Sequence, residues 1–233
     1  MEVALKASLS TLPLPFMKSI SKIVVLNFKL EWSERRSYFS LLIYVLSTVY
    51  LSNLVFKEQL SVQSWNAFFW VIFLFAAVQA AYRSFSYEAD QRFLLYYGWL
   101  KPEHLILGKI AYNFIYLWIL ALCTTAVFGF FAGFPIEDPW AFITILSLSA
   151  LGFSAILTLV AGISAKAGNN PALPAILSIP LLYPQILTLS HLSERSLTGF
   201  DWEINARLIL VIALLALVSL LLAFLLFPYL WRD

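Results

Sequence analysis

The sequence predicts an all-α membrane protein with six transmembrane helices, an N-terminal interfacial amphipathic helix and both termini in the cytoplasm. Three observations predict this class. The 233 residues are 61% hydrophobic and 12% charged, with a mean hydropathy of +0.84, whereas soluble domains are about 25% charged. Six runs of at least twenty residues contain no Asp, Glu, Lys or Arg. Most Lys and Arg residues fall on one side of these runs.

Two N-terminal segments precede the first charge-free run. We expect residues 1–17 to form a loose extension and residues 18–233 to form one six-helix transmembrane domain. Within 18–36, apolar residues are interrupted by Lys and Glu. This segment is too charged to span a bilayer and too apolar to be solvated on all sides. It indicates an interfacial helix, because its apolar groups can enter the cytoplasmic leaflet while its lysines meet anionic head groups.

The charge-free runs set the six spans. A spanning helix needs about 20 mostly apolar residues, so each run is long enough to cross the bilayer once and too short to cross twice. The expected spans are approximately 38–56, 65–84, 106–131, 140–165, 171–190 and 208–230. The longest outer loop is expected at 191–206. In the fifth span, Pro174, Pro180 and Pro184 predict helix kinks, because each internal proline removes a backbone hydrogen bond.

The distribution of basic residues predicts the orientation. Twelve of the 15 Lys and Arg residues lie on the side of the termini, and only Lys57, Arg195 and Arg207 lie on the other. The positive-inside bias therefore places both termini in the cytoplasm. The net charge of +2 is then mainly a topology signal and indicates no nucleic-acid partner.

A dense mixture of charged and aromatic residues follows the second span. This segment, YEADQRFLLYYGWLKPEHLILGKI, covers residues 87–110 and lies on the predicted cytoplasmic side. We interpret it as a coupling helix for an ATPase subunit, since aromatic and Arg residues are typical of interface hot spots. The alternative is an ordinary interfacial loop with Tyr and Trp at head-group level. The residues expected to contact the ATPase are Glu88, Asp90, Arg92, Phe93, Tyr96, Tyr97 and Trp99.

The sequence contains no pattern that would make the chain itself an enzyme. It has no G-x-x-x-x-G-K-[ST] phosphate loop, no H-E-x-x-H zinc motif and no G-x-S-x-G serine elbow. ATP hydrolysis, with its ATP and Mg²⁺, is therefore expected on a separate subunit, and we expect no directly bound cofactor or metal. We find no ionisable side chain in the interiors of the spans, which argues against a carrier driven by an ion gradient.

The two histidines raise an alternative from another class of protein. His104 and His191 fall on opposite sides of the membrane in the predicted topology, so they cannot ligate one iron together. A haem-binding membrane chaperone that uses His191 alone is the alternative hypothesis.

Three stretches carry a resemblance to a known family. They are FKLEWSERRSYFSLLIYVL (28–46), the segment 87–110, and LGFSAILTLVAGISAKAGNNPALPAILSIPLLYPQIL (151–187). They resemble the haem exporter protein B (CcmB) family, the membrane subunit of the cytochrome c maturation ABC transporter complex and a relative of type-2 ABC permeases. The sequence departs from the family at Asp90-Gln91-Arg92-Phe93, where an acidic-Gly-Leu-Glu segment is usual.

The resemblance implies a multi-pass protein of the bacterial inner membrane. It implies two copies of the chain, two ABC ATPase subunits, a haem-handling membrane subunit, a small single-span subunit and a periplasmic haem chaperone. ATP hydrolysis on the partner would release the haem-loaded chaperone, with haem handled by the complex and the segment near 87–104 as the coupling helix. A generic type-2 ABC permease exporting a lipid, glycan or drug is the alternative within the same class.

Overall fold

The computed structural model describes most of the chain. The described residues are 16–33, 35–56, 60–86, 102–167 and 172–232. They form seven helices and, within these ranges, no strand. In chain order the helices are α2 (Phe16–Ser33), α3 (Arg35–Phe56), α4 (Val62–Ser86), α6 (Pro102–Ala132), α7 (Pro139–Lys166), α8 (Ala172–Thr198) and α9 (Trp202–Arg232).

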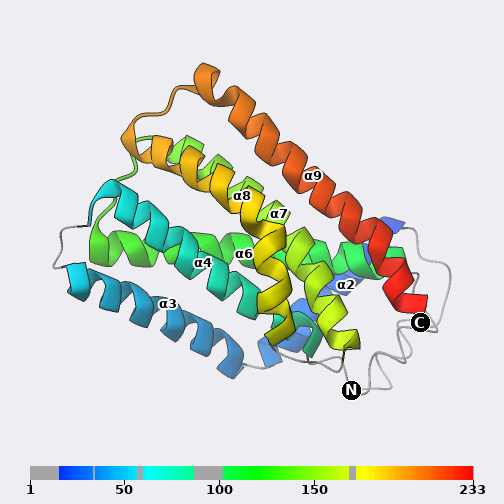
Figure 1. The fold of residues 1–233 in the computed structure, drawn as a ribbon. Helices are drawn as coiled ribbons and strands as arrows, with labels where there is room; N and C mark the ends of the chain where they lie inside the picture. The colour runs from blue at the N-terminus through cyan, green and yellow to red at the C-terminus, as the bar shows by residue number, and fades with distance from the viewer. Residues whose placement is uncertain (1–15, 34, 57–59, 87–101, 168–171, 233) are drawn as a thin grey trace.

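The prediction of an all-helical protein with six spans is confirmed. Six of the helices, α3, α4, α6, α7, α8 and α9, are long and apolar enough to cross a membrane. Successive spans run in alternating directions, so the start of α3 and the end of α9 lie toward the same end of the bundle (Figure 1). The side of the membrane on which this end lies stays a prediction from the basic residues.

The expected outer loop at 191–206 is wrong for most of its length, because residues 202–206 also lie in a helix, the start of α9. Residues 191–198 continue α8, and the connection to α9 is only Gly199–Phe200–Asp201. The charged residues in this stretch suggested a loop, but Leu192, Ser193, Ser196 and Leu197 are buried. Packing of this face therefore holds the last two turns in the helix.

Helix α7 lies at the centre of the bundle. It contacts α4, α6, α8 and α9, and 72% of its apolar stretch is buried, against 17% for α3 and 22% for α9. Small side chains fill this helix between Ser149 and Ser164, which lets neighbouring backbones approach closely in a membrane. Asp138 caps its start by accepting a hydrogen bond from the Ala141 backbone N–H at 3.0 Å, and Pro139 occupies the first turn.

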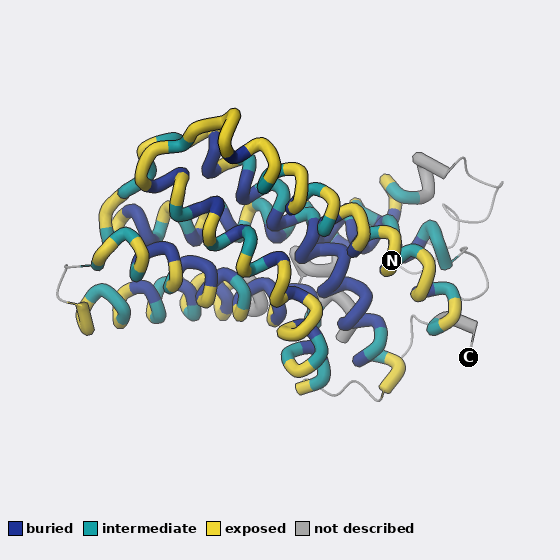
Figure 2. The backbone as a smooth tube through the Cα atoms, turned by 45° about the horizontal axis from the view of Figure 1, so that its top comes forward, coloured by how far each residue is buried: buried dark blue, intermediate teal, exposed yellow. Residues whose placement is uncertain are grey.

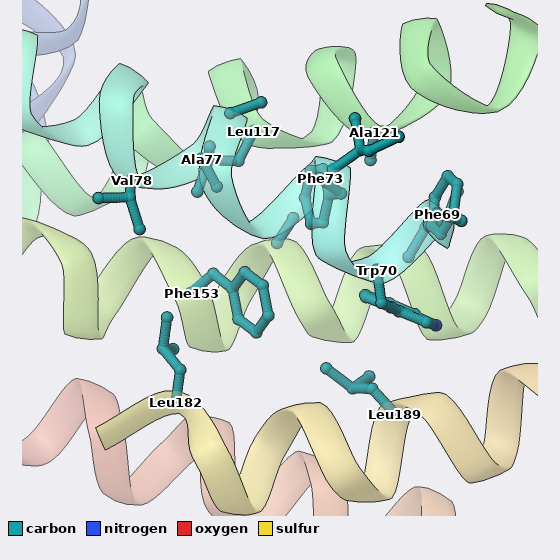
Figure 3. Packing of buried hydrophobic residues seen from close by; sticks show 14 of the residues in the cluster. Phe69, Trp70, Phe73, Ala77, Val78, Leu117, Ala121, Phe153, Leu182 and Leu189 are labelled. Atoms are coloured by element: carbon teal, nitrogen blue, oxygen red, sulfur yellow. The ribbon is translucent and has the colours of Figure 1, made fainter. Parts of the chain in front are cut away.

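Aromatic side chains of α4 fill the space between α4, α6 and α7. The rings of Trp65 and Phe69 stack at 5.5 Å, and those of Phe73 and Phe153 at 5.7 Å. Figure 3 shows Phe153 of α7 between α4 and the leucines of α8. Such aromatic pairs contribute about 0.5–1.5 kcal/mol each beyond the burial of their area.

The outward faces of the bundle are apolar. Buried residues lie on the sides of the helices that face the interior of the bundle, and exposed residues lie on the outer sides (Figure 2). On α3 and α9 these exposed residues are large hydrophobic side chains such as Ile43, Val55, Leu214 and Leu221. Continuous apolar faces of this extent do not occur on soluble monomers, so lipid is their solvent.

Helix α2 packs against the first half of α6. The rings of Phe28 and Tyr112 meet edge to face at 4.8 Å, and Ile23 of α2 is buried over Gly108 of α6. A β-carbon at Gly108 would lie 2.6 Å from Ile23 Cγ2 and 2.8 Å from Ile23 Cβ. The glycine is therefore needed for the close approach of the two helices. An interfacial position for α2 stays a prediction.

Replacing Gly108 by Ala should move α2 away from α6, because Ile23 Cβ is attached to the backbone and cannot rotate aside. Crowding of this kind costs about 1–3 kcal/mol, offset by a gain of roughly 1 kcal/mol for removing a helical glycine. We expect Gly108→Ala to lower the thermal unfolding temperature of the purified protein. The control is Ile23→Ala: in the double variant the two losses should be less than additive, and strict additivity would contradict the contact.

Candidate functional site

The predicted coupling residues lie in 87–101, outside the described residues. Glu88, Asp90, Arg92, Phe93, Tyr96, Tyr97 and Trp99 therefore stay predictions. The structure describes the two helices that this segment connects: α4 up to Ser86 and α6 from Pro102. The chain joins this segment to the bundle at these two helix ends.

The end of α4 is tied to the start of α3. The Arg83 guanidinium donates a hydrogen bond from Nη2 to Ser40 Oγ at 2.9 Å. Pro102 occupies the first turn of α6, where its missing N–H costs nothing, and Glu103 favours the positive end of the helix dipole. Both helix ends are thus locally stabilised where segment 87–101 joins them.

Lys109 is a buried cation that sequence reasoning missed. Its basic charge was assigned to the cytoplasmic loop, yet the structure places it in α6 with 0% of its surface exposed. The prediction that no ionisable side chain lies inside a span is therefore wrong at this position, since the candidate span Pro102–Ala132 contains it. Lys109 directly precedes the third charge-free run, so a count of charges alone could not place it. The available signal was its spacing from Asn113, four residues later on the same helix face.

A hydrogen bond joins α6 to α7 one turn after Lys109. Asn113 Nδ2 donates to Thr158 Oγ1 at 2.8 Å, and Thr158 in turn donates to the Ser154 carbonyl within α7. Both Asn113 and Thr158 are buried. Helix α6 is therefore fastened to α2 through Gly108 and Tyr112 and to α7 through Asn113. The first half of α6 is thus joined directly to the central helix α7.

A second polar cluster fastens the far half of α8. Asn66 of α4 donates from Nδ2 to the Ser190 carbonyl at 2.8 Å, and its Oδ1 accepts from Ser193 Oγ at 2.6 Å and from Trp70 Nε1 at 3.1 Å. The Asp138 backbone N–H donates to the Ser196 carbonyl at 3.1 Å. This half of α8 is held against α4 and against the start of α7.

The three predicted kink prolines occupy different places in α8. Pro174 lies in the first turn and is buried, while Pro180 and Pro184 lie inside the helix and are exposed. The axis of α8 turns in the half that holds these residues (Figure 1). Directly after Pro184, Gln185 donates from Nε2 to Ser219 Oγ of α9 at 2.8 Å. The predicted kinks therefore precede a point at which α8 is bonded to a neighbour.

The two histidines are separated in the fold. His104 is half-buried at the start of α6, and His191 is exposed near the end of α8; these helix ends lie at opposite ends of the bundle (Figure 1). In the part of the chain that the structure describes, no three His, Cys, Asp or Glu side chains gather where they could hold a metal. Haem ligation by His191 stays an alternative prediction.

Comparison with known proteins identifies a family. The family model described as CcmB protein matches residues 18–228, which is nearly the whole chain. Searches of curated proteins and of solved structures each found no match.

Replacing Asn66 by Leu should loosen α8 from α4. The bonds to Ser190 and Ser193 of α8 and the bond from Trp70 within α4 are lost, and such bonds contribute about 0.6 kcal/mol each on average in membrane proteins. We expect a loss of roughly 2 kcal/mol in the free energy of unfolding, measured by denaturant titration in detergent. Gln79→Leu is the matched control, because Gln79 lies exposed on the same helix. If both variants unfold like the wild type, Asn66 does not fasten α8.

Proposed function

The chain belongs to the CcmB family, and on this basis we propose that it couples ATP hydrolysis on a partner subunit to haem delivery during cytochrome c maturation. The family makes it a multi-pass membrane protein of the permease type and a component of an ABC haem exporter system with other Ccm subunits. The finer proposal is that its step is the release of the haem-loaded periplasmic chaperone. Two copies would work with two ATPase subunits in the bacterial inner membrane, beside the haem-handling and single-span subunits.

The family match over residues 18–228 carries this proposal. The arrangement of α6 supports its mechanical part. Segment 87–101 enters α6 at Pro102, and α6 is bonded to the central helix α7 through Asn113 and Thr158. A displacement caused by the ATPase would therefore reach the helix that contacts four other spans.

We propose that this subunit transmits force and does not conduct haem. The supporting observation is the placement of its polar groups. Asn66, Asn113 and Gln185 are buried and bond to neighbouring helices, so they link helices and do not line an open path. Lys109 is a cation inside α6, but its complete burial keeps it from a haem propionate in this conformation.

The coupling assignment predicts the loss of a partner. Replacing Phe93, Tyr96 and Tyr97 together by Ala should leave the protein inserted in the membrane but remove the ATPase subunit from affinity purifications, because aromatic anchors dominate such interfaces. A matched control replaces Phe130 and Trp140, which are exposed aromatic residues at the other end of α6 and at the start of α7. Equal recovery of the ATPase with all variants would argue against the coupling helix.

Deletion of the chain tests force transmission against conduction. Cells that lack it should fail to attach haem to apocytochromes, while the periplasmic chaperone still carries haem, measured as haem bound to the purified chaperone. Expression of the wild-type chain should restore cytochrome assembly. A chaperone without haem in the deleted cells would instead indicate that haem reaches it through this subunit.

A further inference from the structure

An open groove lies between the last turns of α7 and α9. It has a volume of about 550 Å³ and is lined by Leu159, Ile163, Lys166, Leu226, Tyr229 and Leu230. On α7 the lining residues recur at intervals of four and three, so they follow one helix face over about 10 Å. Leu159 is largely buried and forms the floor, whereas Tyr229 is 72% exposed at the side. The groove therefore runs along the helices and opens toward the surroundings of the bundle.

The polarity of the groove changes along its length. Its deep part is formed by aliphatic side chains, while Lys166 is the last residue of α7 and Tyr229 lies in the last turn of α9. Lys and Tyr at the ends of spans lie at head-group level, because each combines an apolar body with a polar tip. The groove thus has the pattern of a phospholipid, with acyl chains inside and a head group at the mouth.

The charge at the mouth selects the head group. Lys166 is exposed, and its ammonium group provides a positive charge at the level of the lipid head groups. The carbonyl end of α7 also lies here, and the negative end of its dipole would repel a phosphate. The Lys166 ammonium must therefore supply the attraction. On the predicted orientation this end faces the cytoplasmic leaflet, whose anionic lipids attract basic residues next to spans.

A second copy of the chain is a poorer occupant of this groove. A two-fold symmetric interface uses the same surface on both copies, which would place both Lys166 side chains in one interface at the same membrane level. Two like charges at the same level oppose such pairing. A lipid phosphate instead complements the charge.

From the groove, its polarity and the position of Lys166, we propose that the chain binds one anionic phospholipid between α7 and α9. The acyl chain lies on Leu159, Ile163 and Leu226, and the phosphate meets Lys166 beside the Tyr229 hydroxyl. This site does not depend on the proposed role in haem delivery. The lipid would contact the central helix α7 at its last turn, after which the chain continues to α8.

The test measures lipid binding to the full chain by native mass spectrometry from detergent, with phosphatidylglycerol or phosphatidylcholine as the added lipid. The wild type should bind phosphatidylglycerol more tightly. Lys166→Gln should weaken this binding about fivefold, the effect of one lysine near a membrane surface. Arg207→Gln is the control, since Arg207 is an exposed cation near the other end of α9 and should change little.

A second variant tests the apolar part of the site. Leu226→Trp fills the groove without a change of charge and should reduce the binding of both lipids; if it fails to fold, Lys166→Gln decides alone. The proposal is overturned if Lys166→Gln binds phosphatidylglycerol like the wild type, or if Arg207→Gln weakens binding equally. Efficient disulfide dimers of a Tyr229→Cys variant would overturn it too, because the groove would then face a second copy.

Discussion

The bundle depends on how α7 packs against its neighbours without a hydrophobic driving force between helices. In lipid, apolar side chains gain little by meeting each other, so association relies on close packing and on hydrogen bonds between spans. The small side chains of α7 allow close packing. Thr158 of α7 forms a hydrogen bond between spans, which it accepts from Asn113 of α6. At Gly152 a β-carbon would lie 2.6 Å from Gln185 Oε1, so a larger residue there would have to displace the Gln185 amide that bonds to Ser219 of α9. Larger side chains along α7 would move this helix away from the four spans that it contacts.

Charge and length were sufficient to predict the spans, because both act along the sequence. A run without charge marks a crossing whatever its neighbours are, and the six expected spans correspond to α3, α4, α6, α7, α8 and α9. The ends were less predictable. A helix continues beyond the apolar run where the side chains of its next turn are buried against neighbouring helices. Leu192 and Ser196 are buried in this way in the last turns of α8. A charged stretch therefore marks the limit of the apolar run and not the limit of the helix.

The residues that join the helices could not be found from the sequence alone. Asn66 and Ser193 are separated by 127 positions, and their types are ordinary for membrane helices. Lys109 resembles a loop lysine, and only the packing of α6 buries it. The docking of α2 depends on the meeting of Ile23 with Gly108, which no local pattern indicates. The predicted ATPase contact, in contrast, rests on the composition of residues 87–101 and on the family resemblance, and these residues lie outside the described structure.

The polar bonds are distributed unevenly along α8, and this has a consequence for movement. From Gln185 onward the helix is bonded to α9 through Ser219 and to α4 through Asn66. Before Gln185, the described side-chain bond of Ser178 goes to the Ala175 carbonyl of the same helix, and Pro180 and Pro184 each remove a backbone bond. Among the described side chains, the first half of α8 therefore has fewer hydrogen bonds to neighbouring helices than the second half. On the proposed coupling, a movement of α7 would displace the half of α8 before Gln185, which follows α7 in the chain, while the far half stays bonded to α4 through Asn66.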